Sequence, residues 1–364
     1  MNGFIKTLTL WAAFAAFASF SALTPTAASA QPADSIGGQA LQTQIERLAM
    51  RLDRQEQKTS RWEKVMDNLP KITGYGIMGF DFAGDAHGHD TSFGISSVRL
   101  MFAGDIGRQF DYKFQFEFVS PKLIDAYLRW RVCPAFNIQA GQFRTGFSIE
   151  GYMVPLEMEA IDYAPIVKAV CTQYCDTRDI GIAAYGTAAQ RNGYSIVEYI
   201  AGVYNGEGKN KADTNHAKDF IGRLKINPLE SLTLSGSFAY GERGETYIRN
   251  IRWAAGAWWH GDAFFMRAEY LRLRQNDWAA AAANNVSGCY AVTGYRIGKF
   301  CPLARYNYME SRFGGNPSVR QSDCTVGLDY TPLKYLRVQA NYTLTHYNGR
   351  GDANLVSVAV TGVF

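Results

Sequence analysis

The segment FDYKFQFEF, Phe110–Phe118, alternates strictly between aromatic and polar side chains. All its even positions are aromatic, and its odd positions hold Asp111, Lys113, Gln115 and Glu117. Successive side chains of a β-strand point to opposite faces, so this segment predicts a strand with one apolar and one polar face. A soluble antiparallel sheet covers a core with its apolar face, whereas a transmembrane barrel turns that face to lipid and lines a lumen with the polar one.

The first thirty residues have the form of an export signal. Lys6 precedes an apolar run from Leu8 to Leu23, and Ala28-Ser29-Ala30 forms an A-x-A cleavage site. We expect residues 1–30 to be removed near Ala30, because the apolar run is short for the alternative, a membrane anchor. No later apolar stretch is long enough for a spanning helix, so a membrane location requires a closed barrel.

The composition agrees with a barrel. Without Lys6 the chain has 36 basic and 33 acidic residues, a net charge of +3, which argues against nucleic-acid binding. Aromatic residues make up 14% of the chain, an abundance typical of the aromatic girdles of transmembrane barrels.

Residues 31–70 are expected to form a short periplasmic helix. Leu41, Ile45, Leu48 and Leu52 follow a heptad spacing, which indicates a short coiled coil that joins neighbouring subunits. The alternative is an amphipathic helix that packs on its own protein.

From residue 71 to residue 364, two-residue alternation recurs in sixteen segments, which predicts an all-β, antiparallel transmembrane barrel. In LIDAYLRWRV, for example, Ile124, Ala126, Leu128 and Trp130 share the apolar face. Short connectors alternate with long ones, as barrel turns alternate with extracellular loops. The longest connector, residues 144–177, is too apolar for a solvated loop, so we expect it to fold into the lumen and constrict it. The chain ends on an amphipathic segment with a terminal aromatic residue, Phe364.

These segments together resemble a known family. VRLMFAGDIGRQFDYKFQFEF, LIDAYLRWR, IQAGQFRTGFSIE, AGVYNGEG, GCYAVTGYRIG and PLARYNYME occur in an order and spacing similar to those of the phosphate-selective porin O and P family of Gram-negative outer membranes. The resemblance implies a trimeric porin of sixteen strands whose third extracellular loop constricts the channel. It also implies passage of small hydrophilic solutes through a barrel embedded in outer-membrane lipid, and it implies no cofactor.

The alternation of each strand predicts which charged residues face the lumen. The acidic ones are Asp111, Glu117, Asp125, Glu198, Glu269 and Asp329. The basic ones, with Arg144 at the constricting loop, are Arg99, Lys113, Arg129, Arg131, Arg144, Arg223, Lys225, Arg252, Arg267, Arg305 and Arg337.

This basic excess predicts a modest preference for anions, phosphate among them, because a narrow charged pore concentrates counter-ions. Two alternatives stay open. The arginines instead form ion pairs across strands and leave the pore with little selectivity, or they bind phosphate tightly.

Other functional classes have weaker support. An enzyme is not expected, because no GxSxG, HExxH or CxxC motif occurs, and a metal site at His87, His89 and Asp90 is less plausible than a solvated loop. A non-conducting structural or adhesive barrel is the main rival. Among the six cysteines, Cys171 and Cys175 are the closest pair, and either a disulfide or free thiols suit an exported chain.

Overall fold

The computed structural model describes residues 47–56, 69–85, 88–173, 175–277, 282–349 and 351–364. It divides into two units, residues 1–67 and 68–364. In the first unit residues 47–56 are helical, and Leu48 and Leu52 are both exposed. Leu41 and Ile45 lie outside the described residues, so the coiled coil stays a prediction. No helix within the described ranges is long and apolar enough to cross a membrane.

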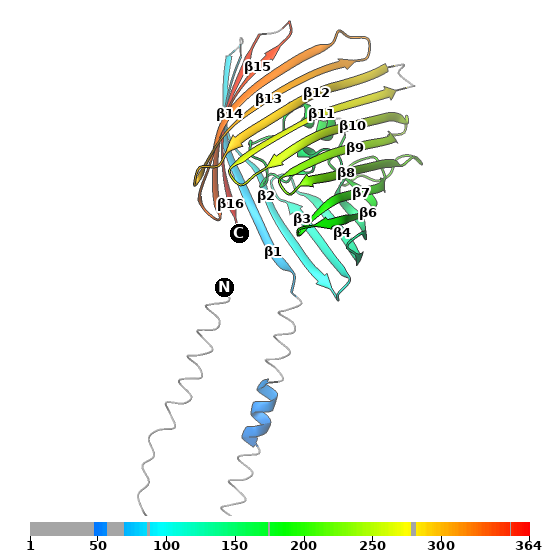
Figure 1. Ribbon diagram of the computed structural model, residues 1–364, viewed down its shortest axis with the longest axis vertical. Helices are drawn as coiled ribbons and strands as arrows, with labels where there is room; N and C mark the ends of the chain where they lie inside the picture. Colours follow the sequence, from blue (N-terminus) through cyan, green and yellow to red (C-terminus); the bar gives the residue numbers. More distant parts are fainter. Residues whose placement is uncertain (1–46, 57–68, 86–87, 174, 278–281, 350) are drawn as a thin grey trace, which may run out of the picture. The chain divides into compact units, whose positions relative to one another are not determined.

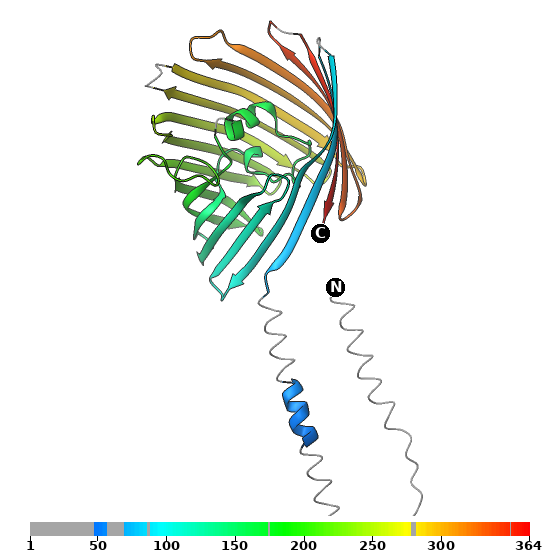
Figure 2. The same ribbon diagram turned by 180° about the vertical axis from the view of Figure 1, so that it is seen from behind.

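The second unit is a closed antiparallel barrel, which confirms the predicted fold class (Figures 1 and 2). Each strand pairs with its neighbours in the chain, and β1 pairs with β16 to close the sheet. The described residues form sixteen strands: β1 (Lys71–Asp85), β2 (Gly88–Ile106), β3 (Phe110–Glu117), β4 (Lys122–Cys133), β5 (Phe136–Arg144), β6 (Arg178–Arg191), β7 (Tyr194–Tyr204), β8 (Asp219–Leu229), β9 (Leu232–Arg243), β10 (Ile248–His260), β11 (Phe264–Asp277), β12 (Ala282–Tyr295), β13 (Phe300–Phe313), β14 (Val319–Leu333), β15 (Leu336–Tyr347) and β16 (Ala353–Val363).

The segment that decides the fold is β3, and its two faces differ as the alternation predicts. Phe114 and Phe116 are 43% and 37% exposed on the outer surface, whereas Asp111 and Gln115 are only 7% and 3% exposed. A soluble sheet would bury the aromatic face instead. The aromatic wall therefore faces outward, and the polar wall faces the inside of the barrel.

Ile124 of β4 departs from this alternation. The sequence pattern assigned it to the outer face, yet it is 2% exposed. The register shifts at this point, because Gln115 of β3 pairs with Asp125 whereas Phe116 pairs with Leu123. Ile124 is thus the extra residue of a β-bulge, and a bulge interrupts the two-residue period locally.

The two ends of the barrel have different connectors. At the end where β1 begins and β16 ends, the turns are short, as between β8 and β9 or between β14 and β15. The opposite end holds the long connectors, although β1 and β2 are joined there by only two residues. The backbone of Phe364 closes the turn end, since its N–H donates to the Gly74 carbonyl at 2.9 Å and its carbonyl accepts from the Gly74 N–H at 2.8 Å.

Candidate functional site

The connector between β5 and β6, hereafter the inner loop (residues 145–177), lies inside the barrel (Figure 2). It carries short helical segments at Glu150–Tyr152 (η1), Pro165–Lys168 (α3) and Ala169–Gln173 (η2). Ile166 and Val167 are 0% exposed and share one apolar cluster with Leu271 of β11 and Val286 of β12. Apolar burial therefore attaches one side of the inner loop to the β11–β12 wall.

A buried ion cluster holds the same loop from the β11 side. The Nη2 atom of Arg267 lies 2.9 Å from a carboxylate oxygen of Glu150 and 2.9 Å from one of Glu159, and both glutamates belong to the inner loop. Glu269, two residues further along β11, accepts hydrogen bonds from the Ser148 hydroxyl at 2.8 Å and the Ile149 N–H at 2.9 Å. Because these charges are almost fully buried, each one depends on its partners to compensate for lost hydration.

Two further arginines of the predicted lumen set bind the backbone of the inner loop. Arg305 donates to the Asp162 carbonyl at 2.6 Å, and Arg337 donates to the Met158 carbonyl at 2.7 Å. The structure therefore brings Arg267, Arg305 and Arg337 together as supports of the inner loop.

Open space remains on the other side of the inner loop, as a cavity of about 510 Å³. Tyr152 and Met153 line it from the loop, and β3 to β8 supply most of the opposing wall. Among the described residues, its acidic lining consists of Asp125, Glu157 and Glu159, and its basic lining of Lys113, Arg129, Arg144, Arg178, Arg223, Lys225 and Arg296. Positive charge thus exceeds negative charge where the inner loop narrows the barrel.

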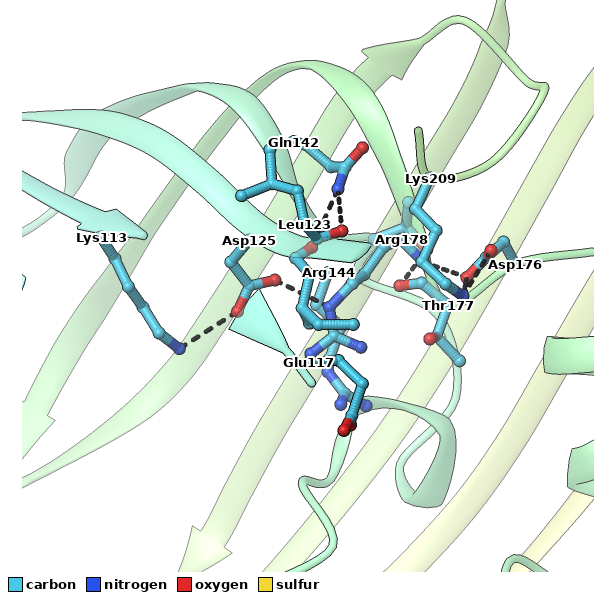
Figure 3. A network of polar contacts seen from close by, with 12 residues as sticks. Lys113, Glu117, Leu123, Asp125, Gln142, Arg144, Asp176, Thr177, Arg178 and Lys209 are labelled. Atoms are coloured by element: carbon cyan, nitrogen blue, oxygen red, sulfur yellow. Dashed lines mark hydrogen bonds and ion pairs between the residues drawn. The ribbon is translucent and has the colours of Figure 1, made fainter. Parts of the chain in front are cut away.

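At one edge of this cavity, Asp125 holds two cations at once (Figure 3). Its carboxylate accepts from Arg178 Nε at 2.7 Å and lies 3.1 Å from Lys113 Nζ. Arg144 lies beside Arg178, and its Nη1 donates to the carbonyls of Gly151 and Met153 at 2.8 and 2.7 Å. Two cations therefore share the Asp125 carboxylate where the inner loop leaves the wall, and a third, Arg144, lies beside them.

Arg178 and Arg296 line the cavity although neither belongs to the predicted lumen set. Alternation along β6 places Ala183, which is 2% exposed, on the inner face, so parity alone assigns Arg178 to the outer face. Arg178 is the first residue of β6, directly after the inner loop, and its contact with Asp125 of β4 follows from the tertiary structure rather than from alternation. Arg296 follows the end of β12 in a turn, where alternation carries no signal.

Most of the predicted lumen cations are ion-paired with a neighbouring strand or turn. Arg129 lies 2.6 Å from Asp111, and Arg99 lies 3.0 Å from Glu117. The same holds for Arg131 with Asp105 and Asp111, for Lys225 with Glu198, and for Arg337 with Asp329. These contacts match the alternative in which arginines pair across strands.

Within the predicted lumen set, four cations have no carboxylate partner among the described residues: Arg144, Arg223, Arg252 and Arg305. Arg223 donates to the Ser148 carbonyl at 3.0 Å, and its guanidinium lies 4.0 Å from the centroid of the Tyr152 ring. Arg252 is 1% exposed beneath Phe147 of the inner loop, away from open space. Arg144 and Arg223 thus combine an unpaired charge with a place on the cavity wall.

Comparison with known proteins agrees with this architecture. Residues 73–241 match the model of the family phosphate-selective porin O and P. This stretch is similar to that family, and it takes in most of β1 to β9, the inner loop and all of the basic cavity lining except Arg296.

Solved structures show the porin fold over the whole barrel. OmpT of Vibrio cholerae, folded in vitro, is 10% identical with a TM-score of 0.62, covering 81% of this chain and 98% of OmpT. An anion-selective porin from Comamonas acidovorans is 12% identical, with a TM-score of 0.62 and coverage of 81% and 99%. OmpF of Salmonella typhi is 10% identical, with a TM-score of 0.56 and coverage of 82% and 98%. No curated protein sequence matches the chain.

The structure has all six cysteines as free thiols. Cys171 and Cys175 are both buried in the inner loop, and a disulfide between them stays a prediction. Burial raises the pKa of the Cys171 thiol above its ordinary range. His87 lies outside the described residues, and within the described ranges no group of three metal-binding side chains occurs.

Proposed function

We propose that this porin passes small hydrophilic solutes by passive diffusion with a modest preference for anions. The observation that carries the proposal is the position of Arg144 and Arg223, which line the cavity beside the inner loop without a carboxylate partner among the described residues. An unpaired positive charge at a narrow point raises the local concentration of anions. The protein acts as a channel, not an enzyme, in the outer membrane after cleavage near Ala30.

The same geometry favours a modest preference over tight phosphate binding. Guanidinium groups bind oxyanions best when two donors are free and aligned. Arg144 Nη1 donates to two loop carbonyls and to the Tyr163 hydroxyl, and Arg223 donates to one carbonyl and stacks on Tyr152. These arginines therefore contribute long-range attraction more than a closed binding site.

The test is the reversal potential of the refolded protein in a planar bilayer under a potassium chloride gradient, repeated with phosphate added. The wild type is expected to shift toward the chloride equilibrium potential, with phosphate reducing the current. Arg144→Gln with Arg223→Gln removes two unpaired charges and is expected to move the potential toward zero.

A matched control removes one ion pair without changing the net charge of the lumen. Lys225→Gln with Glu198→Gln deletes the 3.3 Å pair on the same wall and is expected to leave the reversal potential unchanged. An equal shift in both variants, or no shift in the first, contradicts the proposal and reduces Arg144 and Arg223 to scaffolding.

A non-conducting structural or adhesive barrel is the second candidate, and the apolar cluster that fills one side of the lumen favours it. Absence of conductance from correctly folded protein would support this candidate. We further propose a homotrimer, as in the solved trimer form of OmpT from Vibrio cholerae. Cross-linking of the detergent-solubilised protein tests the trimer separately from conductance.

A further inference from the structure

The outer surface of β10 to β13 changes character along the barrel axis. Toward the turns it carries exposed aromatic side chains such as Phe264 and Phe300. A second aromatic pair lies nearer the loops, where the rings of Trp253 and Tyr270 are 5.0 Å apart and both residues are 39% exposed. Aromatic girdles mark the two edges of the lipid-facing band, so Trp253 and Tyr270 place its outer edge.

At this edge, where Arg272 lies opposite Trp253, and beyond it, arginines replace the aromatic residues of the same outer face. Arg272 and Arg274 follow Tyr270 at two-residue steps along β11, and both are exposed. Arg312 is exposed on the outer face of β13. The register sets Arg274 opposite Asn285 of β12 and sets Asn285 opposite Arg312, so the three arginines share one area of the wall, which we call the outer arginine patch.

No carboxylate of the described residues is seen to neutralise the charges of this patch. Among the described residues, Arg272 and Arg312 have no ion pair, and Arg274 Nε donates only to the Asn276 side chain at 3.3 Å. Glu310 lies on the same face, but Arg320 of β14 holds it at 3.7 Å. Three guanidinium groups therefore face outward, ready to donate hydrogen bonds to an external anion.

We propose that Arg272, Arg274 and Arg312 bind phosphate groups of a phosphorylated glycolipid of the outer leaflet. The patch lies at the loop end of the barrel, which faces the cell exterior in outer-membrane proteins. Arginine is costly in the hydrocarbon band but is attracted to anionic groups at the interface, where it binds phosphate through paired donors.

The spacing of the patch favours a lipid that carries several phosphates over one free anion. Arg272 and Arg274 are separated by about 7 Å along the strand, and Arg312 lies roughly 10 Å across two strand spacings. One inorganic phosphate cannot bridge all three groups at these separations, and they lie on a convex wall rather than in a closed pocket. Adjacent phosphates on one headgroup, anchored by acyl chains against the neighbouring aromatic residues, fit the arrangement.

The experiment compares binding of purified diphosphoryl lipid A to the refolded mature chain in neutral detergent micelles. The test variant is Arg272→Gln with Arg274→Gln and Arg312→Gln. The control variant, Arg191→Gln with Lys299→Gln and Lys334→Gln, removes three exposed positive charges at the turn end of the barrel. All proteins are first checked for barrel formation, and binding is repeated with dephosphorylated lipid A and with inorganic phosphate as competitor.

The wild type and the control are expected to bind diphosphoryl lipid A alike, and the test variant is expected to bind roughly 100-fold more weakly, since each interfacial arginine contributes separately. Dephosphorylated lipid A should bind all three proteins equally weakly. Inorganic phosphate should not compete with diphosphoryl lipid A for the wild type. Equal loss in the control, retained binding in the test variant, or full competition by inorganic phosphate would each overturn the proposal. Conductance is measured in parallel, because the patch lies outside the lumen and its loss should leave the channel unchanged.

Discussion

Arg267 provides the sharpest test of how the inner loop is held. This residue is 2% exposed and supplies the positive charge for two loop carboxylates that are themselves almost fully buried, Glu150 at 1% and Glu159 at 7% exposure. The substitution Arg267→Met keeps the volume but leaves both carboxylates without their cation. Removing one partner of a buried ion pair typically costs about 3–5 kcal/mol, which corresponds to a change of about 100-fold or more in the ratio of docked to released loop.

The assay is limited trypsin digestion of the refolded barrel, followed by fragment masses. Lys168 lies in α3 of the inner loop with its side chain exposed, and trypsin reaches this backbone only when the loop leaves the lumen. Cleavage at Lys168 is therefore expected to be at least about 100-fold faster in Arg267→Met, because cleavage follows the population of the released state. Single-channel conductance should rise in the same variant as the lumen widens.

A rescue variant separates charge from packing. Arg267→Met with Glu150→Gln and Glu159→Gln removes the unpaired charges and should return most of the protection against trypsin. A wild-type cleavage rate in the single variant would refute the reasoning, because the loop would then be held by its apolar cluster alone. Failure of the rescue would show that geometry, rather than charge, decides the docking.

Three further predictions concern other parts of the barrel. Gly141 has φ +125, and an added Cβ would lie 2.2 Å from a carbonyl oxygen of β4. Gly141→Ala should therefore lower the free energy of unfolding in urea by about 1–3 kcal/mol. The control Gly236→Ala, where an added Cβ meets open space, should leave it unchanged. Asp125→Asn should increase the anion preference in reversal-potential measurements, because it frees two cations beside the cavity; an unchanged potential would contradict this. Burial raises the pKa of Cys171 above its ordinary value of 9.0, so alkylation of this thiol should stay slow at pH 9 in the folded protein. The Cys171 thiol ionises at that pH only when the inner loop is released, so docking of the loop should weaken as the pH rises above about 9.

Part of the candidate site could be predicted from the sequence. Alternation placed Arg129 and Arg223 on the inner face, where the structure has them lining the cavity. The apolar composition of the long connector also indicated a loop inside the barrel, and its Ile166 and Val167 are fully buried there. Alternation could not show the partner of each charge. Asp111 neutralises Arg129, whereas Arg223 contacts only the Ser148 carbonyl and the Tyr152 ring.

The sequence by itself determined the fold of this protein, since an alternation of period two along one strand is a local property that decides which face meets lipid. Tertiary structure alone decided which arginines support the loop and which retain an unpaired charge. Arg267 binds residues more than a hundred positions away, and Arg178 reaches Asp125 against its own strand's parity. Such partners depend on the register between strands and on the path of the inner loop, and neither is encoded in the pattern of any single segment.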